Sequence, residues 1–192
     1  MTERQIELIN AAGKLLTKNG VSGLTIKNLA KEMNFSESAV YRHFSSKEDI
    51  IIGMLNYFSS EVNILYGKAI DVNNSPIVNL ESLFSTQFNY FSDKPYIVNA
   101  IFSENLIENN EKINETILNI MKVKQKFLVD IIKKGQEDGV FTSLVSLEDT
   151  IHIIMGSLRL IMFKWKMSNF SFDLKVKGND LVSSILTLIV VK

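Results

Sequence analysis

Apolar residues recur at three- and four-residue spacing along most of the chain, and this spacing constrains the fold more than any other feature. It places them on one face of an α-helix, at positions i, i+3, i+4 and i+7. The second predicted helix shows the pattern with Ile26, Leu29, Ala30 and Met33. The apolar and polar alternation of a half-buried strand occurs only as a weak candidate at 170–176. The sequence therefore predicts an all-α protein.

The composition limits the classes of protein that this chain can belong to. Its 192 residues, 46% of them apolar, suffice for one large or two small domains with a sizeable core. Lys+Arg and Asp+Glu both number 21, so any contact with nucleic acid depends on local arrangement. With no cysteine and only His43 and His152, the chain lacks the side chains of a thiolate or histidine metal cluster. We expect no metal and no cofactor.

The sequence contains no predicted targeting or membrane segment. The N-terminal residues lack the apolar core of a secretory signal. The apolar stretches 151–165 and 181–191 are shorter than the roughly 20 residues that a membrane span needs. We expect a cytoplasmic protein that has no membrane partner.

The first 50 residues predict a helix-turn-helix. Helices are expected over 2–18, 26–33 and 37–44. Asn19-Gly20 provides the stop of the first helix, while Thr25 and Ser36 are suited to cap the second and third. Asn34 can adopt the left-handed conformation that a sharp turn between two short helices needs. Two short helices joined in this way form the motif.

A long helix starting at Ser45-Ser46 and running towards Gly67 is predicted to connect this motif to the rest of the chain. The polar residues 71–76 follow as a turn-rich segment. Further helices are predicted over 77–91, 96–108, 111–137, 147–166 and 179–191. We expect two domains, residues 1–47 and 48–192.

The third predicted helix carries small and polar residues away from Val40 and Phe44, which suits close approach to a DNA major groove. Two runs, Leu24-Thr-Ile-Lys-Asn-Leu-Ala-Lys-Glu-Met and Phe35-Ser-Glu-Ser-Ala-Val-Tyr-Arg-His-Phe-Ser-Ser-Lys-Glu-Asp-Ile, closely resemble the DNA-binding domain of the TetR family. The close match covers about residues 4–51. Family members usually carry Gly in place of Asn34 and commonly in place of Ser38, so the resemblance implies no operator sequence.

The resemblance implies a ligand-responsive regulator, a repressor, whose first domain binds a DNA operator. It implies phosphate contacts for Thr25, Tyr41 and Lys47, and contacts with base edges or nearby backbone for Ser38, Ala39, Arg42 and His43. Lys27 and Ser36 complete the predicted DNA-binding set. Two alternatives stay open: Lys47 as a surface lysine paired with a nearby acid, and His43 as a cap over the turn.

A palindromic operator calls for a dimer, because two recognition helices then lie about 34 Å apart, one turn of the duplex. The resemblance implies that the last two helices of two subunits pack together. Two apolar stripes are available for this, with Gly156 allowing close approach: Ile151, Ile154, Met155, Leu158, Met162 and Trp165 on one helix, and Leu181, Ile185, Leu188 and Ile189 on the other. The alternative is that these stripes form the core of a single chain.

By the same resemblance, apolar residues of the larger domain would line a cavity for a mostly apolar effector, although such residues are more often core. The candidates are Phe58, Phe84, Phe88, Phe102, Met121 and Phe127. Arg159, with His152 seven residues before it, is the candidate for an acidic group of the ligand. An ion pair at an interface is the alternative for Arg159.

A regulator has two alternatives, an enzyme and a helical protein-interaction module. The sequence shows no nucleophile with a base, no metal cluster and no Gly-rich phosphate loop, so an enzyme is not expected. The remaining alternative is a helical protein-interaction module that does not bind DNA.

Overall fold

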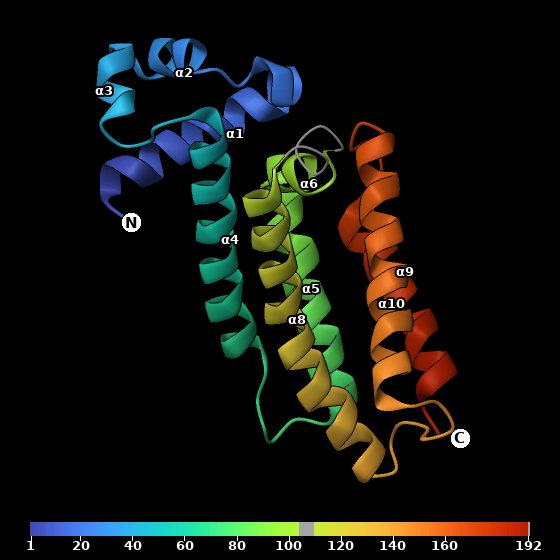
Figure 1. Ribbon diagram of the computed structural model, residues 1–192. Helices are drawn as coiled ribbons and strands as arrows, with labels where there is room; N and C mark the ends of the chain where they lie inside the picture. The colour runs from blue at the N-terminus through green and yellow to red at the C-terminus, as the bar shows by residue number, and fades with distance from the viewer. Residues whose placement is uncertain (104–109, 192) are drawn as a thin grey trace. The chain divides into compact units, whose positions relative to one another are not determined.

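The computed structural model describes residues 1–103 and 110–191 (Figure 1). Apart from an isolated antiparallel bridge between Phe141 and Val190, the regular structure of these residues is helical, as predicted. The helices are α1 (Glu3–Gly23), α2 (Ile26–Met33), α3 (Glu37–Tyr41), α4 (Lys47–Ala69), α5 (Pro76–Asp93), α6 (Pro95–Ile101), α8 (Glu111–Glu137), α9 (Leu147–Met167) and α10 (Leu174–Ile189). No helix in the described ranges is both long and apolar enough to cross a membrane.

The chain forms two compact units, and neither is continuous in sequence. The first comprises Met1–Ser60 with Lys94–Ile120, and the second comprises Glu61–Asp93 with Met121–Lys192. Helices α4 and α8 therefore contribute residues to both units.

Helix α1 is the first helix of the first unit. A capping box begins it, because Thr2 accepts a hydrogen bond from the Gln5 N–H while the Gln5 side chain accepts one from the Thr2 N–H. Gly20 interrupts the helix with a φ of 64°, a left-handed value that glycine adopts without steric cost. The predicted stop at Asn19-Gly20 is thus present, and a further helical turn follows it.

Helix α6 packs on α1 through a close contact at Gly13. A Cβ atom on Gly13 would lie 2.8 Å from the Tyr96 ring, so only glycine leaves room for the ring. The predicted helix 96–108 is found as α6 and ends at Ile101; its residues 104–108 lie outside the described part of the chain.

In the second unit, α10 packs against both α5 and α9. The Phe88 ring of α5 lies directly on Gly178 of α10, where an added Cβ would approach the ring to 2.5 Å. Helix α10 begins five residues before the predicted start at residue 179, because the Asp173 carboxylate caps it by accepting from the N–H groups of Lys175 and Val176.

The strand candidate at 170–176 is wrong. Phe170 has a φ of 60°, which breaks any extended run, and its ring packs edge-on against Trp165 with the centroids 4.7 Å apart. The Trp165 indole N–H donates to the Phe172 carbonyl at 2.9 Å. Local contacts with Trp165 thus organise this segment as a loop, and the helix cap at Asp173 ends it.

Candidate DNA-binding surface and effector region

Local hydrogen bonds build the helix-turn-helix in the way the sequence predicts. Thr25 caps α2 by accepting from the Asn28 N–H at 3.1 Å, and Ser36 caps α3 by accepting from the Ala39 N–H at 3.2 Å. Between them, Asn34 has φ 55° and ψ 41°, the predicted left-handed conformation. Both ends of α2 and the start of α3 therefore have a side chain or a backbone conformation that satisfies them.

Helix α3 is shorter than predicted, since it ends at Tyr41 and not at Phe44. The residues after it turn sharply, with the N–H groups of His43 and Phe44 both directed to the Val40 carbonyl. Val40 is fully buried and Phe44 nearly so. The turn is needed because α4 begins at Lys47, where the Ser46 hydroxyl accepts from the Asp49 N–H.

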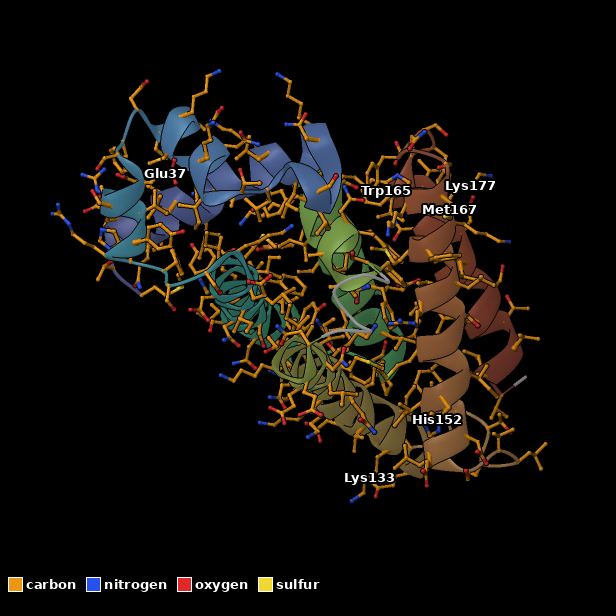
Figure 2. All side chains as sticks on the ribbon, turned by 45° about the horizontal axis from the view of Figure 1, so that its top comes forward. Glu37, Lys133, His152, Trp165, Met167 and Lys177 are labelled. Carbon is orange, nitrogen blue, oxygen red and sulfur yellow. The ribbon has the colours of Figure 1, made fainter. Side chains whose placement is uncertain are left out.

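The predicted DNA-binding residues are mostly accessible. Ala39, His43 and Lys47 are half-buried, and the remaining members of the set are exposed: Thr25, Lys27, Ser36, Ser38, Tyr41 and Arg42. Glu37, labelled in Figure 2, is an acidic residue in the first turn of α3, where it complements the positive end of the helix dipole. The surface that α3 offers is therefore polar, with charge of both signs.

Two residues of the predicted set are tied to the rest of the first unit. The Lys47 ammonium donates to the Val21 carbonyl at 2.6 Å, which links the start of α4 to the end of α1. A backbone carbonyl, and not the acid considered from the sequence, is thus a partner of Lys47. At His43 the backbone carbonyl accepts from the Gln5 side chain at 3.4 Å, so the turn after α3 is attached to α1.

The candidate effector residues are divided between the two units. Phe58 and Phe102 belong to the first unit, and the others to the second. Phe58, Phe84 and Phe88 are buried. Phe102, Met121 and Phe127 are half-buried, whereas His152 and Arg159 are exposed on α9. Figure 2 labels His152 near the start of this helix.

A polar pair lies among the apolar side chains of the second unit. The buried Tyr66 hydroxyl donates to the Gln87 side-chain carbonyl at 3.2 Å, and the Tyr66 ring meets Phe127 edge-on with 5.7 Å between centroids. Burial raises the pKa of Tyr66 above its ordinary value, so the hydroxyl keeps its proton. This pair offers hydrogen-bonding groups beside apolar side chains such as Phe127.

Sequence reasoning missed Lys124, which lies on α8 in the same unit. Its ammonium lies 6.0 Å from the centroid of the Phe84 ring. Burial, and next the charge of Arg159, lower the pKa of Lys124 to about 8. A signal was available, because Lys124 follows Ile117 by seven residues and precedes Leu128 by four, and both of those are buried. A lysine on an inner helix face is unusual.

Helix α9 has two apolar faces, and the structure corrects which of them is available to a partner. Of the predicted stripe, Ile151, Ile154, Leu158, Met162 and Trp165 are buried in the core of this chain, and so is Ile185 on α10. The alternative of an intramolecular core is therefore correct for these side chains. A second series, which we call the exposed α9 stripe, repeats every three or four residues: Ile153, Gly156, Leu160, Phe163 and Met167.

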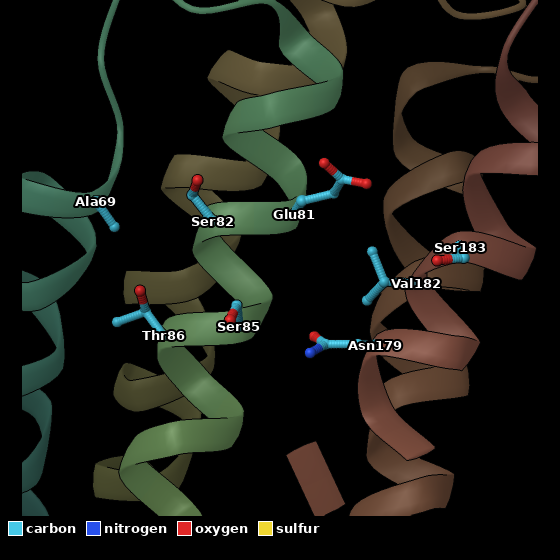
Figure 3. A pocket seen from close by; sticks show the side chains of 8 residues that line it. All are labelled: Ala69, Glu81, Ser82, Ser85, Thr86, Asn179, Val182 and Ser183. Carbon is cyan, nitrogen blue, oxygen red and sulfur yellow. The ribbon is translucent and has the colours of Figure 1, made fainter. Parts of the chain in front are cut away.

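The surface pockets of the second unit include two that are lined by described residues. One, of about 610 Å³, is lined by small polar residues of α5 and α10, with the end of α4 (Figure 3): Ala69, Glu81, Ser82, Ser85, Thr86, Asn179, Val182 and Ser183. The other, of about 480 Å³, lies beside the exposed α9 stripe and is mostly apolar: Ser157, Leu160, Ile161, Lys164, Phe172, Lys177 and Leu181. No predicted effector residue lines either pocket.

Comparison with known proteins agrees with this architecture. Residues 8–54 match the model of bacterial regulatory proteins of the tetR family, and residues 58–191 match that of the YsiA-like protein C-terminal region. The chain is 22% identical over 188 residues to the uncharacterized HTH-type transcriptional regulator YerO of Bacillus subtilis, covering 97% of this chain but 63% of that protein.

Two further comparisons cover nearly the whole of both chains. The HTH-type transcriptional repressor KstR2 of Mycolicibacterium smegmatis is 25% identical, over 95% of this chain and 89% of its own length. The structure of the transcriptional regulator FadR from Bacillus subtilis in complex with stearoyl-CoA superposes with a TM-score of 0.82 at 19% identity, covering 95% and 97%.

The capped α2–turn–α3 motif and the two family matches define a helix-turn-helix transcriptional regulator. This chain belongs to the TetR family. The relatives described above are named as transcriptional regulators and not as enzymes.

Proposed function

We propose that this protein is a cytoplasmic repressor that binds a palindromic operator as a homodimer and leaves it when a mostly apolar small molecule binds. The observation that carries the proposal is the α2–turn–α3 motif, in which caps and a left-handed Asn34 hold a short helix with an accessible polar surface. A helix held in this way can enter the major groove with its side chains in fixed positions.

Within this motif we assign roles by the atoms that reach outward. Thr25 keeps a hydroxyl proton for a phosphate while its oxygen caps α2, and Lys47 keeps two of its three ammonium donors after its bond to Val21. Tyr41, 53% exposed, has its hydroxyl accessible to the DNA backbone. Arg42 is exposed and able to make a bidentate contact with guanine.

The exposed α9 stripe supports a dimer. Leu160 is 53% exposed and Leu188 on α10 is 78% exposed, which is costly for large apolar side chains unless a partner covers them. Gly156 is exposed, and nothing lies within 4 Å of the position that its Cβ would occupy. A second copy of α9 could approach closely there, and the neighbouring 480 Å³ pocket could receive a side chain of the partner.

The effector is proposed to bind in the second unit. The apolar side chains Phe84 and Phe127 and the polar pair Tyr66–Gln87 combine apolar surface with hydrogen-bonding groups, as small-molecule sites do. FadR, which has the same fold, was solved with stearoyl-CoA, and this supports an effector with an acyl chain.

Operator binding is the deciding experiment. Fluorescence anisotropy with a labelled fragment of the gene's own upstream DNA should show saturable binding to an inverted repeat, and binding to a scrambled fragment of equal length should be at least about 1,000-fold weaker. Equal affinity for both fragments would contradict the proposal. A complete lack of DNA binding would favour the alternative of a protein-interaction module.

A further inference from the structure

The pocket of Figure 3 is chemically different from the apolar region proposed for the effector. Its volume of about 610 Å³ is that of a small-molecule site. Among the described residues that line it, two, Ala69 and Val182, are apolar, and the others carry hydroxyl, amide or carboxylate groups. None of the candidate effector residues contributes to it. A ligand that fits this pocket is therefore hydrophilic and is not the apolar effector.

Two neighbouring helices supply most of the polar groups. On α5, Ser82 precedes Ser85 by three residues and Thr86 by four, so all three lie on one part of the helix surface. On α10, Asn179 and Ser183 lie four residues apart. The close contact between a ring of α5 and a glycine of α10, described above, holds the two helices together. The pocket is thus a fixed space between two rows of polar side chains.

The hydroxyl groups of this pocket differ from others on the helices of the second unit. Ser184 and Thr187 of α10 donate to the carbonyl four residues earlier, and Ser157 of α9 does the same. Such a bond satisfies a hydroxyl within its own helix. Within residues 1–103 and 110–191, no hydrogen bond is found for the hydroxyls that line the pocket: Ser82, Ser85, Thr86 and Ser183. Their donors and acceptors are directed to the pocket side of the helices and remain available to a ligand.

A carboxylate determines the charge of the pocket. Glu81 is exposed on α5, and Figure 3 shows its side chain and that of Asn179 pointing into the space between α5 and α10. In the described ranges, no lysine or arginine lines the pocket and no ion pair includes Glu81. The carboxylate would repel an anion, whereas an ammonium group can form a charge-assisted hydrogen bond with it.

We propose that this pocket binds a hydroxylated amine of the amino-sugar class, with the ammonium group at Glu81. The ligand hydroxyls then bond to the serine and threonine hydroxyls of α5 and to Asn179 and Ser183 of α10. A sugar hydroxyl donates one hydrogen bond and accepts others, and the hydroxyls and the amide of the pocket can do both as well. This inference goes beyond the proposed function, because it adds a second, hydrophilic ligand to the apolar effector.

The test uses three disaccharides with the same β-1,4-linked skeleton, formed from glucosamine, N-acetylglucosamine and glucose. Dissociation constants are measured by calorimetry on the full chain below neutral pH, where the amine is protonated. We expect the glucosamine disaccharide to bind about tenfold more tightly than the other two, which lack the ammonium group. No operator DNA and no apolar effector are present, so the result does not depend on the proposed function.

Two pairs of variants locate the binding. Glu81→Gln keeps the size of the side chain and should weaken binding of the glucosamine disaccharide about tenfold, with the glucose disaccharide unaffected. Glu148→Gln is the matched control, because Glu148 is exposed on α9 outside the pocket. Ser183→Ala should weaken all three ligands about fivefold, because a hydrogen bond is lost. Ser184→Ala should change nothing, since the Ser184 hydroxyl already donates to the Asp180 carbonyl.

Thermal unfolding gives an independent measurement of the same binding. The glucosamine disaccharide should raise the melting temperature of the wild type and raise that of Glu81→Gln less, because a ligand stabilises only the folded state that binds it. The unliganded variants should melt with the wild type, since both substituted side chains are exposed. Equal affinity for the glucosamine and glucose disaccharides would overturn the role of Glu81. Unchanged binding in both Glu81→Gln and Ser183→Ala, or no binding of any of the three, would overturn the proposed site.

Discussion

Lys47 and Lys124 are half-buried lysines on long helices of the two units, but their ammonium groups have different surroundings. Lys47 donates to the Val21 carbonyl at 2.6 Å and thereby joins two helices. Lys124 lies beside an aromatic ring and within the electrostatic influence of Arg159. A partner that accepts hydrogen bonds makes the first lysine part of the framework, whereas no ion pair of the second lysine is found among residues 1–103 and 110–191.

The difference extends to the regions around them. In the helix-turn-helix, Thr25 and Ser36 cap helices and most of the other polar side chains of α2 and α3 are exposed, so they cause little loss of stability. On α8, the charged Lys124 lies beside the Phe84 ring, and on α9 the exposed α9 stripe presents apolar side chains to solvent. The first region is thus built from contacts within the chain, whereas the second contains the surface on which we propose that a second subunit packs.

The largest expected effect separates the two faces of α9. Leu158→Asp should abolish cooperative folding, because it places a charge at a fully buried position, with an expected cost above about 4 kcal/mol. Leu160→Asp should preserve the helical circular dichroism and give a monomer in sedimentation velocity. A dimeric Leu160→Asp protein would show that the exposed α9 stripe is not the interface.

Operator binding tests the first region, with a smaller effect. Arg42→Ala should cost about 1 to 3 kcal/mol on the preferred operator and much less on random DNA, because a base contact is lost. Tyr41→Ala should weaken binding to every sequence about equally, since a phosphate contact carries no sequence information. Anisotropy titrations on matched and scrambled duplexes measure both. Equal losses for Arg42→Ala on the two duplexes would reassign this residue to the backbone.

The pH dependence of stability tests the second region. Between pH 8 and 10.5, the unfolded chain holds a Lys124 proton that the folded chain has released. The loss of folding stability caused by the charged Lys124 is therefore complete below this window and disappears as the pH rises through it. Lys124→Met should therefore be more stable than the wild type at pH 7.5, and this advantage should shrink by about 1 to 2 kcal/mol by pH 10, allowing for partial solvent access. Urea unfolding at both pH values measures it; an advantage independent of pH would contradict the lowered pKa.

The smallest effect concerns the turn between α2 and α3. Asn34→Ala should lower the free energy of unfolding by about 1 kcal/mol, because alanine enters the left-handed region less readily than asparagine. Asn34→Gly, the residue usual in the family, should change it by less than about 0.5 kcal/mol or raise it slightly. Thermal unfolding compares the two variants, and equal losses would show that the backbone conformation of Asn34 is not what matters.

The sequence predicted those parts of the fold that neighbouring residues determine. Thr25 and Ser36 were identified as caps and Asn34 as the left-handed turn, because each acts on a backbone group within three residues. The position of Lys124 and the choice between the two faces of α9 were not predicted. Both depend on which helices pack together, and the spacing of apolar residues on α9 fits either face.

The effector residues remain predictions, and so do the individual DNA contacts. Periodicity identifies Phe84 and Phe88 as inward-facing, but it does not distinguish a residue that packs on a glycine, as Phe88 does on Gly178, from one that lines a ligand site.

The contact between Tyr96 and Gly13 has a practical consequence for protein engineering. Helix α1 completes its packing with a helix that lies about eighty residues further along the chain, so the DNA-binding part is not a cassette that one cut can remove. A chimaera that exchanges only the first sixty residues with a relative would bring a foreign α1 against the resident Tyr96. Any donor with a side chain larger than hydrogen at the position of Gly13 must supply its own α6 as well.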